Sequence, residues 1–351
     1  MDTLTVALAS LGGVVLAGVI AHGAWQARRA GPKQASGPRE EPSASAAARR
    51  DEPGLDDDDA GASDDPASSA PRRLSKRVPL QLDALIDAFA TFTLDAAVSA
   101  EAIAPHLAAK RFVGSKLFLV EGLNSESGRW EAPAPGQRYA EIQAGVQLAS
   151  RTGAINEIEY SEFVQRIQAI ADAIGASADF PDMLDVMARA RELDAFASQH
   201  DAQLAVRLHA RGAAWSVGYI QQHARRHGFV AGVVPGRLVY PSSEEGAPPV
   251  LTLTFDSQAA LADEPDRAAV RDVTLSFDVP QTDPSVEPFR AWQAAAQALA
   301  VGMDAAIVDD NERPLNSEGF ATIGGELGQL YAMLEERDLA AGSAAARRLF
   351  S

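Results

Sequence analysis

The sequence contains no cysteine. This absence excludes disulfides, thiolate nucleophiles, iron–sulfur clusters and cysteine-based zinc sites, and it fits a reducing compartment. Aromatic residues are also scarce, at 6% of the 351 residues, against 46% for all hydrophobic types together. A hydrophobic core must therefore be built mainly from Leu, Val, Ile and Ala.

Positive charge is in short supply as well. The chain has 31 Lys and Arg against 48 Asp and Glu, which gives a formal net charge of -17. Proteins that bind nucleic acid gather basic side chains against the phosphates, so this balance argues against nucleic acid as a partner. The length is sufficient for two domains of ordinary size.

A long apolar stretch runs from Leu4 to Trp25. As a helix of about 22 residues it would be about 33 Å long, enough to span a bilayer core. Positive charge follows the stretch at Arg28 and Arg29 and does not precede it, which is the reverse of a signal peptide, the main alternative. We therefore predict a single-pass anchor over residues 1–26, with the N-terminus outside, the bulk of the chain in the cytoplasm, and Trp25, Arg28 and Arg29 at the membrane interface.

The next segment, residues 27–78, is rich in Pro, Ala, Ser, Gly and charge, and it includes the run Asp56-Asp57-Asp58-Asp59. It has too few large apolar side chains to form a core, which predicts a disordered linker. A calcium site is the alternative for the acidic run, but the run lacks the glycine and the terminal glutamate of an EF-hand loop.

The pattern of residues 201–340 predicts an α+β unit. Apolar and polar residues alternate in Leu204–His209, Val250–Phe255 and Val273–Val279, as in strands with one face in a core and the other in water. Apolar side chains at helical spacing predict a helix from Phe289 to Met303 and another that begins near Asn316. The order is strand, helix, three strands, helix, strand, helix.

Residues 79–200 show the same order of elements. The predicted strands and helices lie at 85–94, 99–110, 116–122, 129–131, 141–149, 160–174, 178–180 and 183–198. The fold class is therefore α+β, with two units that each have a mostly antiparallel sheet backed by helices. A duplication explains the shared order, and an unrelated N-terminal α+β domain is the alternative. We assign residues 341–351 to a tail.

Two separate parts of the chain carry recognisable motifs. His22-Gly23-x-Trp25-x-x-Arg28 closes the apolar stretch, and residues 202–338 contain Ile220-Gln221-Gln222, Gly228-Phe229, Val273 through Pro280, and Val308-Asp309-Asp310. Both parts resemble the ZipA family of bacterial cell-division proteins, which anchor FtsZ to the inner membrane. The second match extends over a whole domain, with the motifs in the family's order and at similar spacing.

The resemblance implies a domain with helices on one side of a sheet and an open face that binds the C-terminal tail of FtsZ. It also implies a protein of the inner membrane that tethers the Z ring at midcell and helps to recruit other division proteins. The implied contact residues are Arg207, Val234, Leu238, Thr252, Thr254, Asp256, Thr274 and Ser276. Ser276 replaces a large aromatic of the family, and Asp256 replaces an apolar residue, so the face is expected to be more polar and more acidic than is usual.

Motifs for enzyme chemistry have simpler explanations. His223 and His227 have metal-ligand spacing on a predicted helix, but two arginines separate them and a carboxylate ligand is not evident. Gly324-Gly325-x-x-Gly328 lies inside an amphipathic helical pattern and not between a strand and a helix, unlike a dinucleotide loop. Asp309-Asp310 is predicted to be an exposed turn that pairs with Arg313. We therefore expect no enzyme activity, no cofactor and no metal.

A second hypothesis keeps the anchor but changes the partner. In it, the protein is a membrane-anchored scaffold whose first unit recruits a partner other than FtsZ. The polar Ser276 and Asp256 on the implied FtsZ face motivate this alternative.

Overall fold

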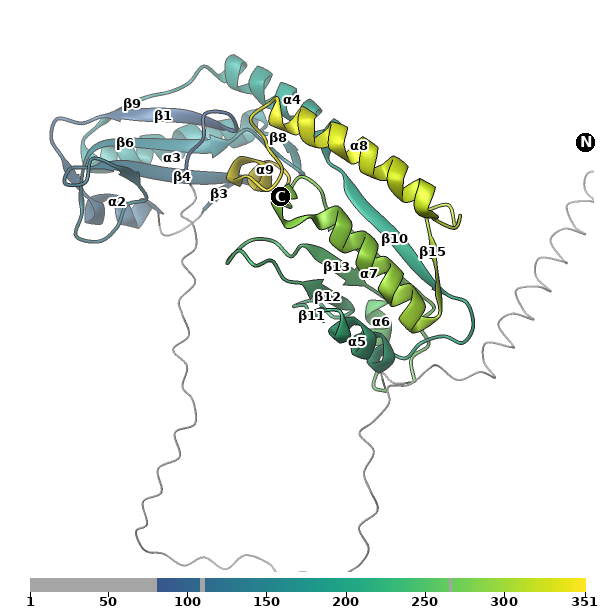
Figure 1. The fold of residues 1–351 in the computed structure, drawn as a ribbon. Coiled ribbons are helices and arrows are strands. Elements are labelled where there is room, and N and C mark those ends of the chain that lie inside the picture. The colour runs from purple at the N-terminus through teal and green to yellow at the C-terminus, as the bar shows by residue number, and fades with distance from the viewer. Residues whose placement is uncertain (1–80, 108–110, 265–266) are drawn as a thin grey trace, which may run out of the picture.

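The computed structural model describes residues 81–107, 111–264 and 267–351 (Figure 1). The predicted anchor and linker, with Trp25, Arg28 and Arg29, lie outside the described residues. Within the described part of the chain, no helix combines the length and the apolar character that a membrane span requires.

The first unit is an antiparallel sheet with three helices. Its strands are β1 (Asp87–Thr93), β2 (Val98–Ser99), β3 (Phe112–Val113), β4 (Lys116–Asn124), β5 (Trp130–Glu131), β6 (Arg138–Gln147), the β7–β8 hairpin (Ala149–Ser150 and Gly153–Ala154) and β9 (Ser177–Asp179). Its helices are α2 (Ala100–Leu107), α3 (Glu157–Ile174) and α4 (Met183–His200). The main sheet has the order β3-β4-β6-β1-β9.

Local sequence explains where α3 begins and ends. The side chain of Asn156 accepts hydrogen bonds from the amides of Ile158 and Glu159, and the Glu159 carboxylate accepts one from the amide of Asn156, which makes a complete capping box. Gly175 ends the helix in the left-handed conformation, at φ 66°. Apolar residues of α3 such as Phe163 then pack on the sheet in one core cluster.

The second unit has the sheet order β11-β12-β13-β14-β10-β15. Its strands are β10 (Gln203–Ala210), β11 (Val230–Ala231), β12 (Arg237–Tyr240), β13 (Leu251–Thr254), β14 (Asp272–Asp278) and β15 (Ala305–Val308). Its helices are α5 (Val217–Arg226), α6 (Ser257–Ala260), α7 (Pro288–Met303) and α8 (Ser317–Glu335), and the short helix α9 (Ala344–Leu349) follows them in the chain. The predicted strands and the long helices are thus confirmed.

One face of the second sheet forms the core with the helices. Leu208, Leu253 and Leu275 are fully buried there, together with Trp292 of α7. The indole nitrogen of Trp292 donates to the carbonyl oxygen of Leu275 at 3.0 Å, so this large side chain is buried without an unpaired polar atom. Since the core-facing residues alternate with polar ones, the opposite face of each strand is left for solvent or for a partner.

The two units share a strand order. β4-β6-β1-β9 in the first sheet corresponds to β13-β14-β10-β15 in the second, and all neighbouring strands in both runs are antiparallel. β1 therefore lies between β6 and the short strand β9 in the first unit, just as β10 lies between β14 and the short strand β15 in the second. The α+β class predicted from the sequence is confirmed.

Residues 341–351, which we had assigned to a tail, lie between the two units (Figure 1). Leu349 and Phe350 are fully buried in a cluster that also contains Ile86 and Ala149 of the first unit and Leu334 of α8. Arg348 of α9 donates to both carboxylate oxygens of Asp87, at 2.9 and 2.5 Å. The C-terminal residues therefore join the units and do not hang free.

Candidate partner-binding face

A polar row crosses the face of the second sheet that lies opposite the helices. Arg207 on β10 is paired with Thr274 on β14, Thr274 with Thr254 on β13, and Thr254 with Arg237 on β12. Directly opposed residues in antiparallel strands share a face, so these four side chains form one line. Arg207 and the two threonines are partly exposed, and Arg237 is exposed.

A second row lies beside the first. It runs through Ala205, Ser276, Thr252, Val239 and Val230 on β10, β14, β13, β12 and β11. Ser276 is only 6% exposed, whereas Val230 is 49% exposed. The row therefore changes from small and polar in the middle of the sheet to apolar at the β11 edge.

Five of the eight residues implied by the family resemblance lie on these two rows: Arg207, Thr252, Thr254, Thr274 and Ser276. The placement of Leu238 on this face was wrong. Leu238 is paired with Leu253, is 5% exposed and belongs to the core cluster. Because side chains alternate along a strand, an error of one residue moves the whole strand to the other face, and Arg237 and Val239 are the β12 residues that face outward.

Val234 and Asp256 lie near the face but outside its strands. Val234 is in the turn between β11 and β12 and is 54% exposed. Asp256 follows β13 and caps the short helix α6, where its carboxylate accepts a hydrogen bond from the amide of Gln258 at 2.8 Å. This carboxylate is therefore engaged by its own backbone.

Arg237 is a face residue that the sequence comparison did not include. Its guanidinium donates to the hydroxyl of Thr252 at 3.3 Å, and at the other end of the polar row Arg207 donates to the carboxylate of Glu312 at 3.4 Å. Three strand spacings separate the two arginines, or about 14 Å between their backbones. The alternation of Arg237 and Val239 about the buried Leu238 is the signal that would have found both residues.

The histidines and aspartates considered above for enzyme chemistry make a ring contact, a helix cap and an ion pair. The ring of His223 packs against that of Tyr219, with 4.4 Å between the centroids and 44° between the planes, and His227 is the C-cap of α5. Arg313 pairs with Asp309 at 3.2 Å, as predicted. In the described ranges, His, Asp and Glu form no group of three or more that could hold a metal ion.

A buried lysine that the sequence pattern did not single out joins β4 to the β7–β8 hairpin. Lys116 is 1% exposed, and its ammonium group donates to the hydroxyls of Ser150 and Thr152 and to the carbonyl oxygen of Gly153, at 3.1, 2.9 and 2.6 Å. Burial lowers the pKa of Lys116, while Glu159 and Asp194 oppose that shift. All three ammonium donors have a partner, which indicates a structural role.

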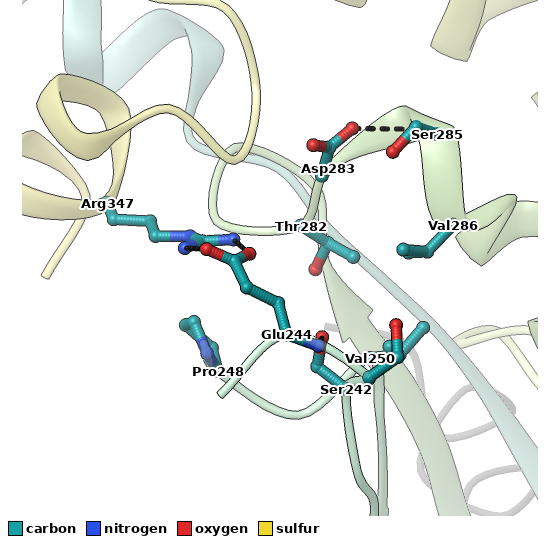
Figure 2. A pocket seen from close by; sticks show the side chains of 10 residues that line it. Ser242, Glu244, Pro248, Val250, Thr282, Asp283, Ser285, Val286 and Arg347 are labelled. Carbon is teal, nitrogen blue, oxygen red and sulfur yellow. Dashed lines mark hydrogen bonds and ion pairs between the residues drawn. The ribbon is translucent and has the colours of Figure 1, made fainter. Parts of the chain in front are cut away.

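A small pocket beside α9 is closed by an ion pair of its own. Figure 2 shows Arg347 and Glu244 facing each other across it, and the guanidinium donates to both carboxylate oxygens at 3.2 and 2.8 Å. At the rim, Asp283 accepts a hydrogen bond from the amide of Ser285 at 2.8 Å. The pair of Arg347 and Glu244 thus connects α9 to the loop between β12 and β13.

Comparison with known proteins does not assign a family. No family model matches the sequence, and no curated protein matches it. Among solved structures, the berberine bridge enzyme from Eschscholzia californica is reported at a TM-score of 0.16 and 9% identity, covering 75% of this chain and 55% of the enzyme chain. So weak a likeness carries no argument about fold or function.

Proposed function

We propose that the protein is a membrane-tethered binding protein of cell division that captures the C-terminal tail of FtsZ on the outer face of its second sheet. The observation that carries this proposal is the polar row between Arg207 and Arg237, which lies on the face opposite the helices. The motifs shared with the ZipA family support the identity of the partner. No step of the proposal requires a cofactor or covalent chemistry.

The chemistry of the face suits an extended peptide that carries both acidic and apolar side chains. Guanidinium groups form strong, charge-assisted hydrogen bonds with carboxylates. At about 3.3 Å per residue, a span of about 14 Å corresponds to about four residues of extended chain between two acidic side chains. Val239 and Val230 offer an apolar contact beside them.

The rest of the proposed architecture positions this face. The predicted anchor holds the domain at the cytoplasmic membrane, and the predicted linker gives it reach. Several tethers on one FtsZ filament bind multivalently, so a modest affinity at each site is sufficient. The shared strand order supports a duplication of one ancestral α+β unit, with the second copy specialised for the tail.

The experiment compares capture of intact FtsZ and tail-deleted FtsZ by the full chain in nanodiscs. We expect capture of intact FtsZ only, and at least about a tenfold loss of affinity when Arg207→Glu and Arg237→Glu are combined. Arg290→Glu is the matched control, because its side chain is 81% exposed and lies on α7, away from the face. Equal capture of both forms of FtsZ would refute the proposal.

The alternative function is a membrane scaffold for a different partner. It is favoured by Ser276, which is 6% exposed and offers little contact where the family has a large aromatic. Localisation of a fluorescent fusion distinguishes the two functions. A midcell band agrees with FtsZ capture, whereas a uniform envelope signal supports the scaffold.

A further inference from the structure

The outer face of the first sheet is occupied by the chain itself. Residues 81–86, which precede β1, fold back so that Leu82 lies against Gly145 near the C-terminal end of β6. A Cβ atom on Gly145 would be 2.4 Å from Cδ2 of Leu82, so a side chain at position 145 would force Leu82 out of its present place. Gly145 is in register with Phe89 on β1 and Leu119 on β4, which give the seat an apolar border.

Side chains from three other elements hold the backbone of this segment. The carboxylate of Glu121 on β4 accepts a hydrogen bond from the amide of Leu82 at 2.8 Å. Arg348 of α9 donates to the carbonyl oxygen of Gln81 at 3.0 Å, and Arg189 of α4 donates to that of Ala84 at 2.8 Å. These contacts recognise peptide groups and not side chains, which is how proteins bind extended peptides of varied sequence.

Glu121 is the most informative member of this set. It is only 3% exposed, and its second carboxylate oxygen accepts a hydrogen bond from the side-chain amide of Gln143 at 2.9 Å. A carboxylate is costly to bury unless its oxygens are hydrogen-bonded. The strand that carries Glu121 therefore bears a built acceptor for one peptide N–H beside the leucine seat.

The strand order relates this face to that of the second unit. β6 and β4, which carry Gly145 and Glu121, correspond to β14 and β13. We infer that the outer face of the first sheet is a peptide-binding groove that residues 81–84 fill in cis, with Leu82 as the anchoring side chain. The groove is selective for a short segment that places one leucine in this seat, and residues 81–84 keep it closed to other peptides.

This inference separates the roles of the two units. The outer sheet face of the first unit binds residues 81–84 of the chain itself. The outer sheet face of the second unit remains available for a partner. The contacts of residues 81–84 do not depend on the proposed capture of FtsZ. Each proposal can therefore fail without the other.

The test uses the full chain and a fluorescent peptide with the sequence of residues 80–85, Leu-Gln-Leu-Asp-Ala-Leu. Leu82→Asp removes the anchor from the groove, so the peptide should bind this variant at least about tenfold more tightly than wild type in an anisotropy titration. Leu184→Asp is the control, because Leu184 is 71% exposed on α4 and the same charge is added outside the groove. Adding Gly145→Val to Leu82→Asp fills the seat and should abolish peptide binding.

A second readout keeps the test decisive if Leu82→Asp weakens the fold. In wild type the amide of Leu82 should be protected from hydrogen exchange by Glu121, and Gly145→Ala should raise its exchange rate while the β6 amides stay protected. Equal peptide binding to wild type and Leu82→Asp, or binding to neither, would overturn the groove. Rapid exchange of the Leu82 amide in wild type would overturn it as well.

Discussion

Removal of one partner of the buried ion pair between Arg348 and Asp87 should strongly destabilise the protein at the junction between the two units. Asp87 is 0% exposed and Arg348 is 7% exposed, so water cannot replace either partner. Arg348→Met leaves the Asp87 carboxylate with one remaining hydrogen bond, from the amide of Asp83 at 2.8 Å. Removal of one member of a buried pair costs about 3–5 kcal/mol, because the other charge remains buried without its partner.

Urea unfolding of the full chain followed by circular dichroism measures this cost. With a denaturant slope of about 3 kcal/mol/M, the midpoint should fall by about 1–1.7 M for Arg348→Met. Arg290→Met is the control, since Arg290 and Glu287 form an exposed pair, with side chains 81% and 66% exposed, and such pairs contribute under about 1 kcal/mol.

A double-mutant cycle isolates the pair from other effects of the substitutions. Arg348→Met combined with Asp87→Leu removes both charges, so the double variant should be more stable than Arg348→Met alone. A loss below about 1 kcal/mol for Arg348→Met, or a double variant as unstable as the sum of the single changes, would refute this account of the junction.

Four further substitutions test the face, a helix cap and a buried hydroxyl by the same unfolding assay. Leu238→Ala should cost about 2–5 kcal/mol because it opens a cavity in the core, whereas Val239→Ala on the outer face should cost under about 1 kcal/mol. Burial alone would raise the pKa of Glu159, but hydrogen bonds from Ser115 and from the Asn156 amide hold this pKa below its ordinary 4.5. Wild type should therefore be more stable than Glu159→Gln above pH 4.5. This difference should disappear as pH falls through the lowered pKa. Tyr331→Phe should be neutral or stabilising by up to about 1 kcal/mol, because the hydroxyl of Tyr331 is buried without a partner and burial raises its pKa to about 12.

Each of these expectations has a clear contrary result. Similar losses for Leu238→Ala and Val239→Ala would mean that the register of β12 is wrong. An unchanged difference between wild type and Glu159→Gln below pH 4.5 would mean that this carboxylate is not stabilised in its charged form. A loss above about 1 kcal/mol for Tyr331→Phe would point to a hydrogen bond at its hydroxyl.

The sequence predicted the elements well because their patterns are local. Apolar and polar residues alternate with a period of two residues in Leu251–Thr254 and Asp272–Asp278. This pattern can be recognised even in strands of four and seven residues. Asn316 is a typical N-cap, and α8 does begin at Ser317. Even so, the position of Leu238 was carried over from the family resemblance, although the alternation along β12 itself places this residue in the core.

The junction and the filled groove could not be predicted in the same way. Arg348 and Asp87 are 261 positions apart, and a short helix rich in alanine gives no sign of what it packs against. Glu121 and Lys116 are charged residues inside strands, and only the fold shows that each is buried and hydrogen-bonded. The face residues Arg207 and Arg237 are likewise 30 positions apart and become one site through the strand order.

Site-specific photo-crosslinking tests the central claim most directly. A photoreactive amino acid replaces Thr252 on the outer face of the second sheet in one version of the full chain, and Val301, which is 86% exposed on α7, in another. FtsZ capture on this face predicts a crosslink to intact FtsZ from position 252, none from position 301, and none from either position with tail-deleted FtsZ. A crosslink from position 301 alone, or one from position 252 that persists without the tail, would contradict the account.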